Sequence, residues 1–117
     1  MAIDHVLAVA PVTDLHQAAQ WYELLLGRPA DNRPMDTLAE WRVTETGWLQ
    51  VFRDPERSGS GLVNFAVGDL ERHLEALAGR GIELDGIQEA DQGVRLASVT
   101  DPAGNTITFI GGFRIAS

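Results

Sequence analysis

Cysteine is absent from this chain of 117 residues. Disulfide bonds, thiolate metal ligands and a catalytic thiol are therefore excluded. Secreted domains of this size often depend on disulfides, so their absence favours a reducing compartment, and we expect the protein in the cytoplasm. Two other catalytic signals are missing as well: no segment has the Gly-x-Ser-x-Gly pattern of a nucleophilic serine, and the serine–glycine run 58–61 lacks the lysine of a phosphate-binding loop.

Positive charge and long apolar runs are also scarce. Lys and Arg number 9 against 17 Asp and Glu, which gives a net charge of −8. Nucleic acid requires a basic surface, so we expect no nucleic-acid partner, whereas the acidity favours solubility and a cationic over an anionic ligand. The longest apolar stretch, 6–12, contains a proline and is far shorter than the roughly 20 residues of a membrane span. The N-terminus begins Met-Ala-Ile-Asp-His, without the basic segment of a secretory signal, so we expect neither a signal peptide nor a membrane partner.

The first half of the chain alternates apolar strands with one helix. The segment 3–10 predicts a buried strand, and Asp14 is a candidate N-cap for a helix whose apolar side chains recur at helical spacing from Leu15 to Leu26. Gly27 predicts its end. A short edge strand near 28–33, a strand over 37–44 and a return strand over 48–53 follow, with Thr46-Gly47 as a hairpin turn.

The second half repeats this order. After a polar Gly/Ser-rich segment, 62–67 predicts a strand, and Asp69 is a candidate N-cap for a helix that ends near Gly79 and Gly81. Three further strands are predicted over 82–87, 94–99 and 106–110. Each half is thus a strand, a helix and three strands, which predicts one α+β domain of two βαβββ modules: module one about 1–54, a linker 55–60, and module two 61–113.

Three motifs give the chain a family resemblance. They are His5-Val-Leu-Ala-Val ahead of Asp14-Leu15, the helix end Trp21-Tyr-Glu-Leu-Leu-Leu-Gly27, and the turn Asp101-Pro-Ala-Gly-Asn105, which by its residue types sets hairpin geometry. Together they resemble the vicinal oxygen chelate superfamily of glyoxalase I, bleomycin-binding resistance proteins, fosfomycin-resistance thiol transferases and extradiol dioxygenases. The resemblance implies that two modules, often from two subunits of a homodimer, curl their sheets around a small-molecule cavity.

The metal-dependent members of that superfamily hold a divalent ion on four inner-face side chains. Carried over to this sequence, the four positions are His5, Gln50, Leu62 and Thr108. Leucine has no donor atom, and a threonine hydroxyl is a poor replacement for a carboxylate, whereas such a site needs three or four good ligands. The comparison therefore predicts no metal and no cofactor, and it leaves an irregular metal site as the alternative.

Strand alternation predicts which side chains line the cavity. Residues two apart share one face of a strand, so an inward His5, Gln50, Leu62 or Thr108 brings its neighbours with it. The predicted ligand-binding residues are His5, Leu7, Trp41, Trp48, Gln50, Phe52, Leu62, Asn64, Thr108 and Ile110. An apolar, aromatic wall with a few polar groups is typical of a small-molecule site and suits a planar or cationic ligand. The other interpretation is that the aromatic side chains fill the core or a dimer contact.

Three hypotheses for the function follow. The first is a metal-independent protein that binds or sequesters an aromatic or cationic small molecule between two subunits, in the manner of the bleomycin-binding members. The second is a lyase, isomerase or thiol transferase of the same superfamily with an irregular metal site. The third is an accessory module whose cavity has lost its use. The sequence names no catalytic residue, and fold alone does not choose between these functions.

Overall fold

A computed structural model describes residues 2–113, and it contains the two predicted modules. Module one consists of β1 (Val6–Val12), α1 (Leu15–Leu26), β2 (Asn32–Met35), β3 (Leu38–Arg42) and β4 (Gly47–Arg53). Its strands form a four-stranded mixed sheet in the order β1-β4-β3-β2, in which β1 is parallel to β4 and the other pairs are antiparallel.

Module two has the same topology. It consists of β5 (Leu62–Val67), α2 (Leu70–Gly79), β6 (Gln88–Glu89), a short 3-10 turn (Asp91–Gly93), β7 (Arg95–Thr100) and β8 (Thr106–Gly111). The sheet order is β5-β8-β7-β6, with β5 parallel to β8. The predicted α+β fold of two βαβββ modules is therefore confirmed.

The predicted helix signals are also confirmed. The carboxylate of Asp14 accepts a hydrogen bond from the backbone N–H of Gln17, and Asp69 does the same for Arg72. Each cap satisfies one of the backbone donors that a helix start leaves without an intrahelical partner. At the other end of α1, Gly27 adopts φ +78°, and its N–H donates to the carbonyl of Glu23. A residue with a Cβ is strained in that left-handed conformation, which explains the glycine.

Several strand boundaries were predicted wrongly. The first strand begins at Val6 and continues through Pro11 to Val12, because β1 is the edge of its sheet and a proline there removes no ladder hydrogen bond. The edge strand expected near 28–33 is β2, at Asn32–Met35. The segment 82–87 forms no strand: Ile82 is buried in the core, and Leu84 and Ile87 pack against it from an irregular chain.

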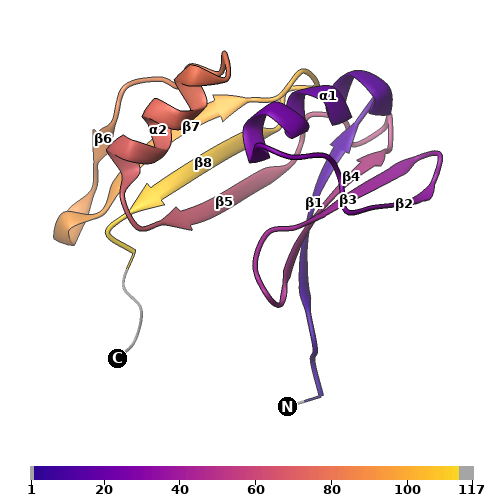
Figure 1. Cartoon of the computed structure of the whole chain (residues 1–117), viewed down its shortest axis with the longest axis horizontal. Coiled ribbons are helices and arrows are strands. Elements are labelled where there is room, and N and C mark those ends of the chain that lie inside the picture. The colour runs from indigo at the N-terminus through magenta and orange to yellow at the C-terminus, as the bar shows by residue number, and fades with distance from the viewer. Residues whose placement is uncertain (1, 114–117) are drawn as a thin grey trace.

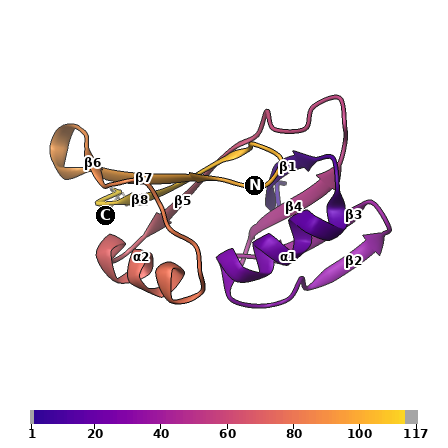
Figure 2. The same ribbon diagram turned by 90° about the horizontal axis from the view of Figure 1, so that it is seen from above.

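Each sheet has its helix on one face only. Figure 1 shows the two modules side by side, and Figure 2 shows α1 and α2 on the same side of the two sheets. The buried core lies between sheets and helices, and it includes Tyr22, Leu25, Leu49, Leu77 and Phe109. The opposite faces carry no helix, so the two sheets remain open.

The turn between β7 and β8 joins the modules. Asp101 is 4% exposed, and its carboxylate accepts hydrogen bonds from Tyr22 Oη of α1 (2.6 Å) and from Asn105 Nδ2 (2.8 Å). The amide of Asn105 also donates to the carbonyl of Pro11 in β1 (2.7 Å). The motif was predicted to set hairpin geometry. The structure adds a buried polar network between its side chains and the first module.

Candidate functional site

The uncovered face of each sheet is the first candidate for a functional site, and we call the two surfaces the open faces. Strand register decides which residues they carry: β1 and β4 pair Leu7 with Trp48 and Val9 with Gln50, and β5 and β8 pair Asn64 with Thr108. Alternation then assigns the remaining positions. The predicted residues on the open faces are His5, Leu7, Trp48, Gln50 and Phe52 from module one, and Leu62, Asn64, Thr108 and Ile110 from module two. Their role in binding a ligand stays a prediction.

Trp41 was placed on the wrong face. It pairs with Leu49 in β3–β4 register, so it points toward α1 and is completely buried. Its ring lies 6.1 Å from that of Tyr22, and its indole N–H donates to the carbonyl of Arg28 (2.9 Å). Alternation along the predicted strand 37–44 puts Ala39, Trp41 and Val43 on one face, as the structure has them, but the prediction that Trp41 lines the cavity assigned that face to the ligand rather than to the core.

The exchange of faces brings two charged residues onto the open face of module one. Glu40 lies opposite Gln50, whose side-chain amide donates to its carboxylate (2.7 Å). Arg42 lies opposite Trp48, with its guanidinium carbon 6.0 Å from the indole centroid. Strand alternation puts Glu40 and Arg42 on the face opposite that of Trp41. If Trp41 had been assigned to the core, both residues would have been predicted on the open face.

The polar groups of the open faces form pairs. Trp48 donates its indole N–H to Nδ1 of His5 (3.3 Å), so the neutral imidazole carries its proton on Nε2. On module two, the hydroxyls of Ser98 and Thr108 lie 2.8 Å apart. Between these pairs stand exposed apolar side chains, of which Leu62 is 79% exposed and Leu7 and Val9 are each 46% exposed.

The residues present do not fit the metal site of the superfamily. Gln50 pairs with Val9, which is four residues from His5, so these two donors lie about 13 Å apart along the strand. On module two, Thr108 pairs with Asn64 and not with Leu62. Within residues 2–113 no group of three or more His, Asp or Glu side chains is arranged to hold a metal ion.

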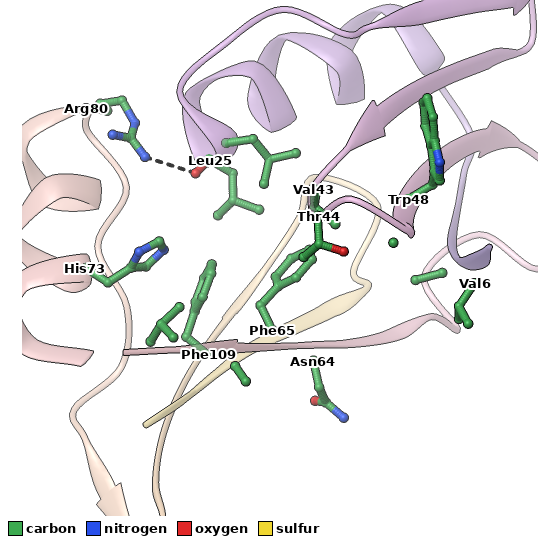
Figure 3. A pocket seen from close by; sticks show the side chains of 15 residues that line it. Val6, Leu25, Val43, Thr44, Trp48, Asn64, Phe65, His73, Arg80 and Phe109 are labelled. Carbon is green, nitrogen blue, oxygen red and sulfur yellow. Dashed lines mark hydrogen bonds between the residues drawn. The ribbon is translucent and has the colours of Figure 1, made fainter. Parts of the chain in front are cut away.

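A second candidate lies on the helix side, in the groove where the modules meet. It is a cleft of about 460 Å³, which we call the inter-module cleft. Figure 3 shows Leu25 of α1, Phe65 and Phe109 of the second sheet, and His73 and Arg80 of the α2 segment around it. Of the predicted residues, only Trp48 and Asn64 belong to its wall. Sequence reasoning missed this cleft because its walls come from both modules and exist only after they pack together.

Two basic side chains border the cleft. Arg80 donates hydrogen bonds to the last carbonyls of α1, from Nε to Leu24 and from Nη2 to Leu25 (3.0 Å). The His73 ring packs 4.6 Å from that of Phe109. Burial, and after it the positive charge of Arg80, holds the pKa of His73 below its usual value, so the ring is neutral at pH 7. Its Nε2 is shielded from solvent and has no hydrogen-bond partner among residues 2–113.

Comparisons with known proteins place the chain in a family. A search of curated proteins gave no match. The crystal structure of a glyoxalase/bleomycin resistance protein from Catenulispora acidiphila DSM 44928 is 31% identical, with a TM-score of 0.85 over 92% of this chain and 96% of that one. At 18% identity, where the likeness concerns the fold alone, the chain is similar to a bleomycin-binding protein complexed with bleomycin (TM-score 0.76; 94% and 99% covered) and to a lactoylglutathione lyase from Agrobacterium tumefaciens (0.73; 92% and 92%). A family model described as a glyoxalase-like domain matches residues 6–110, so the protein belongs to this family of the vicinal oxygen chelate superfamily.

Proposed function

We propose that the protein binds a small molecule between the open faces of two copies of the chain, without a metal ion. The observation that carries the proposal is the composition of those faces: large exposed apolar side chains alternate with paired polar groups on two sheets that no helix covers. Such a mixture is typical of ligand cavities, where apolar walls supply affinity and a few polar groups fix orientation. A bleomycin-binding protein solved with bleomycin has the same fold.

A second copy would bury two exposed leucines and one exposed valine. Leu7 and Val9 of β1 and Leu62 of β5 present apolar surface on the open faces. Complete burial of one such side chain stabilises an interface by about 1.5–3 kcal/mol. In a symmetric dimer each of these residues is buried once in each copy, so its contribution to the interface doubles. We therefore expect the open face of one copy to pack against that of the other.

The ligand that these faces suit is aromatic or cationic. Trp48 and Phe52 offer ring surfaces for stacking, and Glu40 supplies a carboxylate on the same face. The guanidinium of Arg42 lies beside Trp48, so positive charge is at that position of the face. Glu40, opposite Gln50, supplies the negative charge. A flat ligand with a positively charged group would lie on the rings with its charge toward Glu40.

The donor set supports the proposed metal independence. The four positions that correspond to the metal ligands of the superfamily are His5, Gln50, Leu62 and Thr108, and the register separates the two stronger donors. Binding is therefore expected to depend on shape, stacking and the Glu40 charge. Metal analysis of purified protein tests this directly: a stoichiometric divalent ion that is lost in His5→Ala would refute it.

The main experiment joins assembly to binding. We expect light scattering after size exclusion to give a dimer, and calorimetric titration of planar aromatic amines and their neutral analogues to favour the amines. Leu62→Asp should weaken dimerisation by about a hundredfold or more, because it removes two buried leucines per dimer. The same variant should lose ligand binding.

Matched variants separate surface effects from site effects. Met35→Asp, on edge strand β2, changes another exposed apolar residue and should leave both dimer and binding unchanged. Glu40→Gln keeps the shape of the side chain and should reduce binding of the amine to that of its neutral analogue. A monomeric wild-type protein, or equal binding by Glu40→Gln and wild type, would contradict the proposal.

A further inference from the structure

The inter-module cleft combines an apolar interior with basic groups at one end. Its walls include the rings of Phe65 and Phe109 and the side chain of Leu25, and its volume of about 460 Å³ lies in the range of small-molecule pockets. His73 and Arg80 both stand on the α2 side, as Figure 3 shows. The cleft therefore has apolar walls and one basic end, which suits a ligand with an apolar body and one polar end.

The charge of the cleft is opposite to that of the chain. The protein has a net charge of −8, yet no Asp or Glu belongs to the cleft wall among the residues described, and Arg80 does. Two arms of its guanidinium donate to the carbonyls of Leu24 and Leu25, whereas Nη1 makes no hydrogen bond to residues 2–113. A cation held in place by its other contacts, with both N–H groups of Nη1 unused by the described residues, is a preorganised partner for a carboxylate.

His73 supplies a second unmet group. A buried polar atom without a partner destabilises a protein, so a shielded imidazole nitrogen in a cleft wall calls for a partner. His73 belongs to the cleft wall, and rotation of its ring about the Cβ–Cγ bond redirects this nitrogen, so that an oxygen of a bound molecule in the cleft can reach it. The neutral ring offers one donor to such an oxygen.

From these observations we propose that the inter-module cleft binds a small amphipathic carboxylate, with its carboxylate between Arg80 and His73 and its apolar chain or ring against Leu25, Phe65 and Phe109. This site lies on the helix side of the sheets and shares only Trp48 and Asn64 with the predicted residues of the open faces. One chain alone forms all its walls, and it takes an anion where the open faces are expected to take a cation.

Three ligands of one chain length test the head-group preference: octanoate, 1-octanol and octylammonium, each titrated by calorimetry and by backbone amide NMR. We expect octanoate to bind about tenfold or more tightly than 1-octanol, because hydrogen bonds to a charged group are stronger than those to a neutral one. Octylammonium should bind more weakly than either. Amide shifts should concentrate at Phe65, His73 and Phe109. Equal affinity for octanoate and octanol, no binding of octanoate, or shifts confined to Gln50 and Thr108 would overturn the proposal.

Variants at the rim keep the test independent of folding. Thr44 is exposed at the cleft and makes no side-chain hydrogen bond within residues 2–113, so Thr44→Glu adds a negative charge and Thr44→Gln is its neutral match. Thr44→Glu should weaken octanoate about fivefold relative to Thr44→Gln and leave octanol unchanged. His73→Phe should keep octanol binding and weaken octanoate. If Thr44→Glu and Thr44→Gln bind octanoate equally, the carboxylate does not lie in the cleft.

The outcome is distinguishable from that of the open-face proposal. Leu62→Asp should weaken the dimer and remove the binding of aromatic amines but leave octanoate affinity unchanged. Loss of octanoate binding in that variant would place the carboxylate at the open faces and refute the cleft site. Failure of the amines to bind, with octanoate bound normally, would refute only the open-face proposal.

Discussion

The hydrogen bond between Tyr22 and Asp101 gives the sharpest test of how the modules are held together. Tyr22 is completely buried in α1 of module one, and its hydroxyl donates to a carboxylate oxygen of module two at 2.6 Å. Tyr22→Phe removes that hydroxyl and little else, because the ring remains in the core. The carboxylate of Asp101 then keeps its bonds from the N–H groups of Ala103 and Asn105 and from the Asn105 amide.

The expected loss of stability is large for the removal of one hydroxyl group. A hydrogen bond to a charged group contributes about 1.5–3 kcal/mol to stability. For a chain of this length the unfolding entropy converts each kcal/mol into about 4 °C of melting temperature, so Tyr22→Phe should melt about 6–12 °C lower. Urea unfolding followed by far-UV circular dichroism, at one protein concentration for both proteins, measures the free energy of unfolding directly.

The pH dependence supplies a second readout. Burial, and after it the hydrogen bond to Asp101, raises the pKa of Tyr22 well above its usual value near 10. Above pH 10 the unfolded chain loses the phenol proton while the folded protein keeps it, so stability falls as pH rises, by about 1.4 kcal/mol per pH unit. Tyr22 is the only tyrosine, and the sequence has no lysine and no cysteine, so no other side chain titrates between pH 9 and 12.

Tyr22→Phe should therefore abolish the alkaline loss of stability. The variant is less stable at pH 8, and its free energy of unfolding should stay level up to pH 11 while that of the wild type declines toward it. Phenol absorbance at 295 nm should show no ionisation of the folded wild type in this range. A change in unfolding free energy below about 0.5 kcal/mol at pH 8, or parallel pH profiles for the two proteins, would refute the role of this bond.

Three further predictions concern a glycine, a histidine and two tryptophans. Gly59→Ala should destabilise by about 1–3 kcal/mol, because φ is +85° and the new Cβ would stand 2.5 Å from a backbone oxygen of the β7–β8 turn, whereas Gly86→Ala, with open space around it, should change thermal stability little. The lowered pKa of His73 means that the unfolded chain takes up a proton first as pH falls below about 6.5, so His73→Phe should reduce the acid loss of stability in urea unfolding between pH 7 and 5; an unchanged acid profile would contradict this. Trp41→Phe should lower stability by about 1–2 kcal/mol and leave the affinity for aromatic amines unchanged. Trp48→Phe should weaken the binding of aromatic amines and leave stability nearly unchanged. Titration and thermal melting of both variants measure the two effects.

Local signals in the sequence were sufficient to predict the two modules. Asp14 and Asp69 precede apolar residues at helical spacing, and both cap helices as expected because capping depends only on neighbouring backbone groups. The segment 82–87 has the apolar composition of a strand but forms none, since its hydrophobic side chains are satisfied by contact with the core and need no sheet partner. The composition of this segment predicts that its apolar residues are buried, but it does not predict whether they lie in a strand or in irregular chain.

The site was only partly predictable for a related reason. Alternation fixed the two faces of β3, but the sequence does not say which face the helix covers, so Trp41 was assigned to the cavity and Glu40 to the opposite face. The proposed class of ligand is unchanged, but on the open face of module one the carboxylate of Glu40 stands where the indole of Trp41 was predicted.

The linear order of residues determined the repeat, the two helices with their caps and the family, because these depend on short-range patterns. Only tertiary structure decided the orientation of the modules, the buried bond from Tyr22 to Asp101, and the cleft between His73, Arg80 and the first helix. Those features bring together residues far apart in the sequence, since 79 positions separate Tyr22 from Asp101 and 55 separate Leu25 from Arg80, and packing geometry, not local pattern, sets such distances.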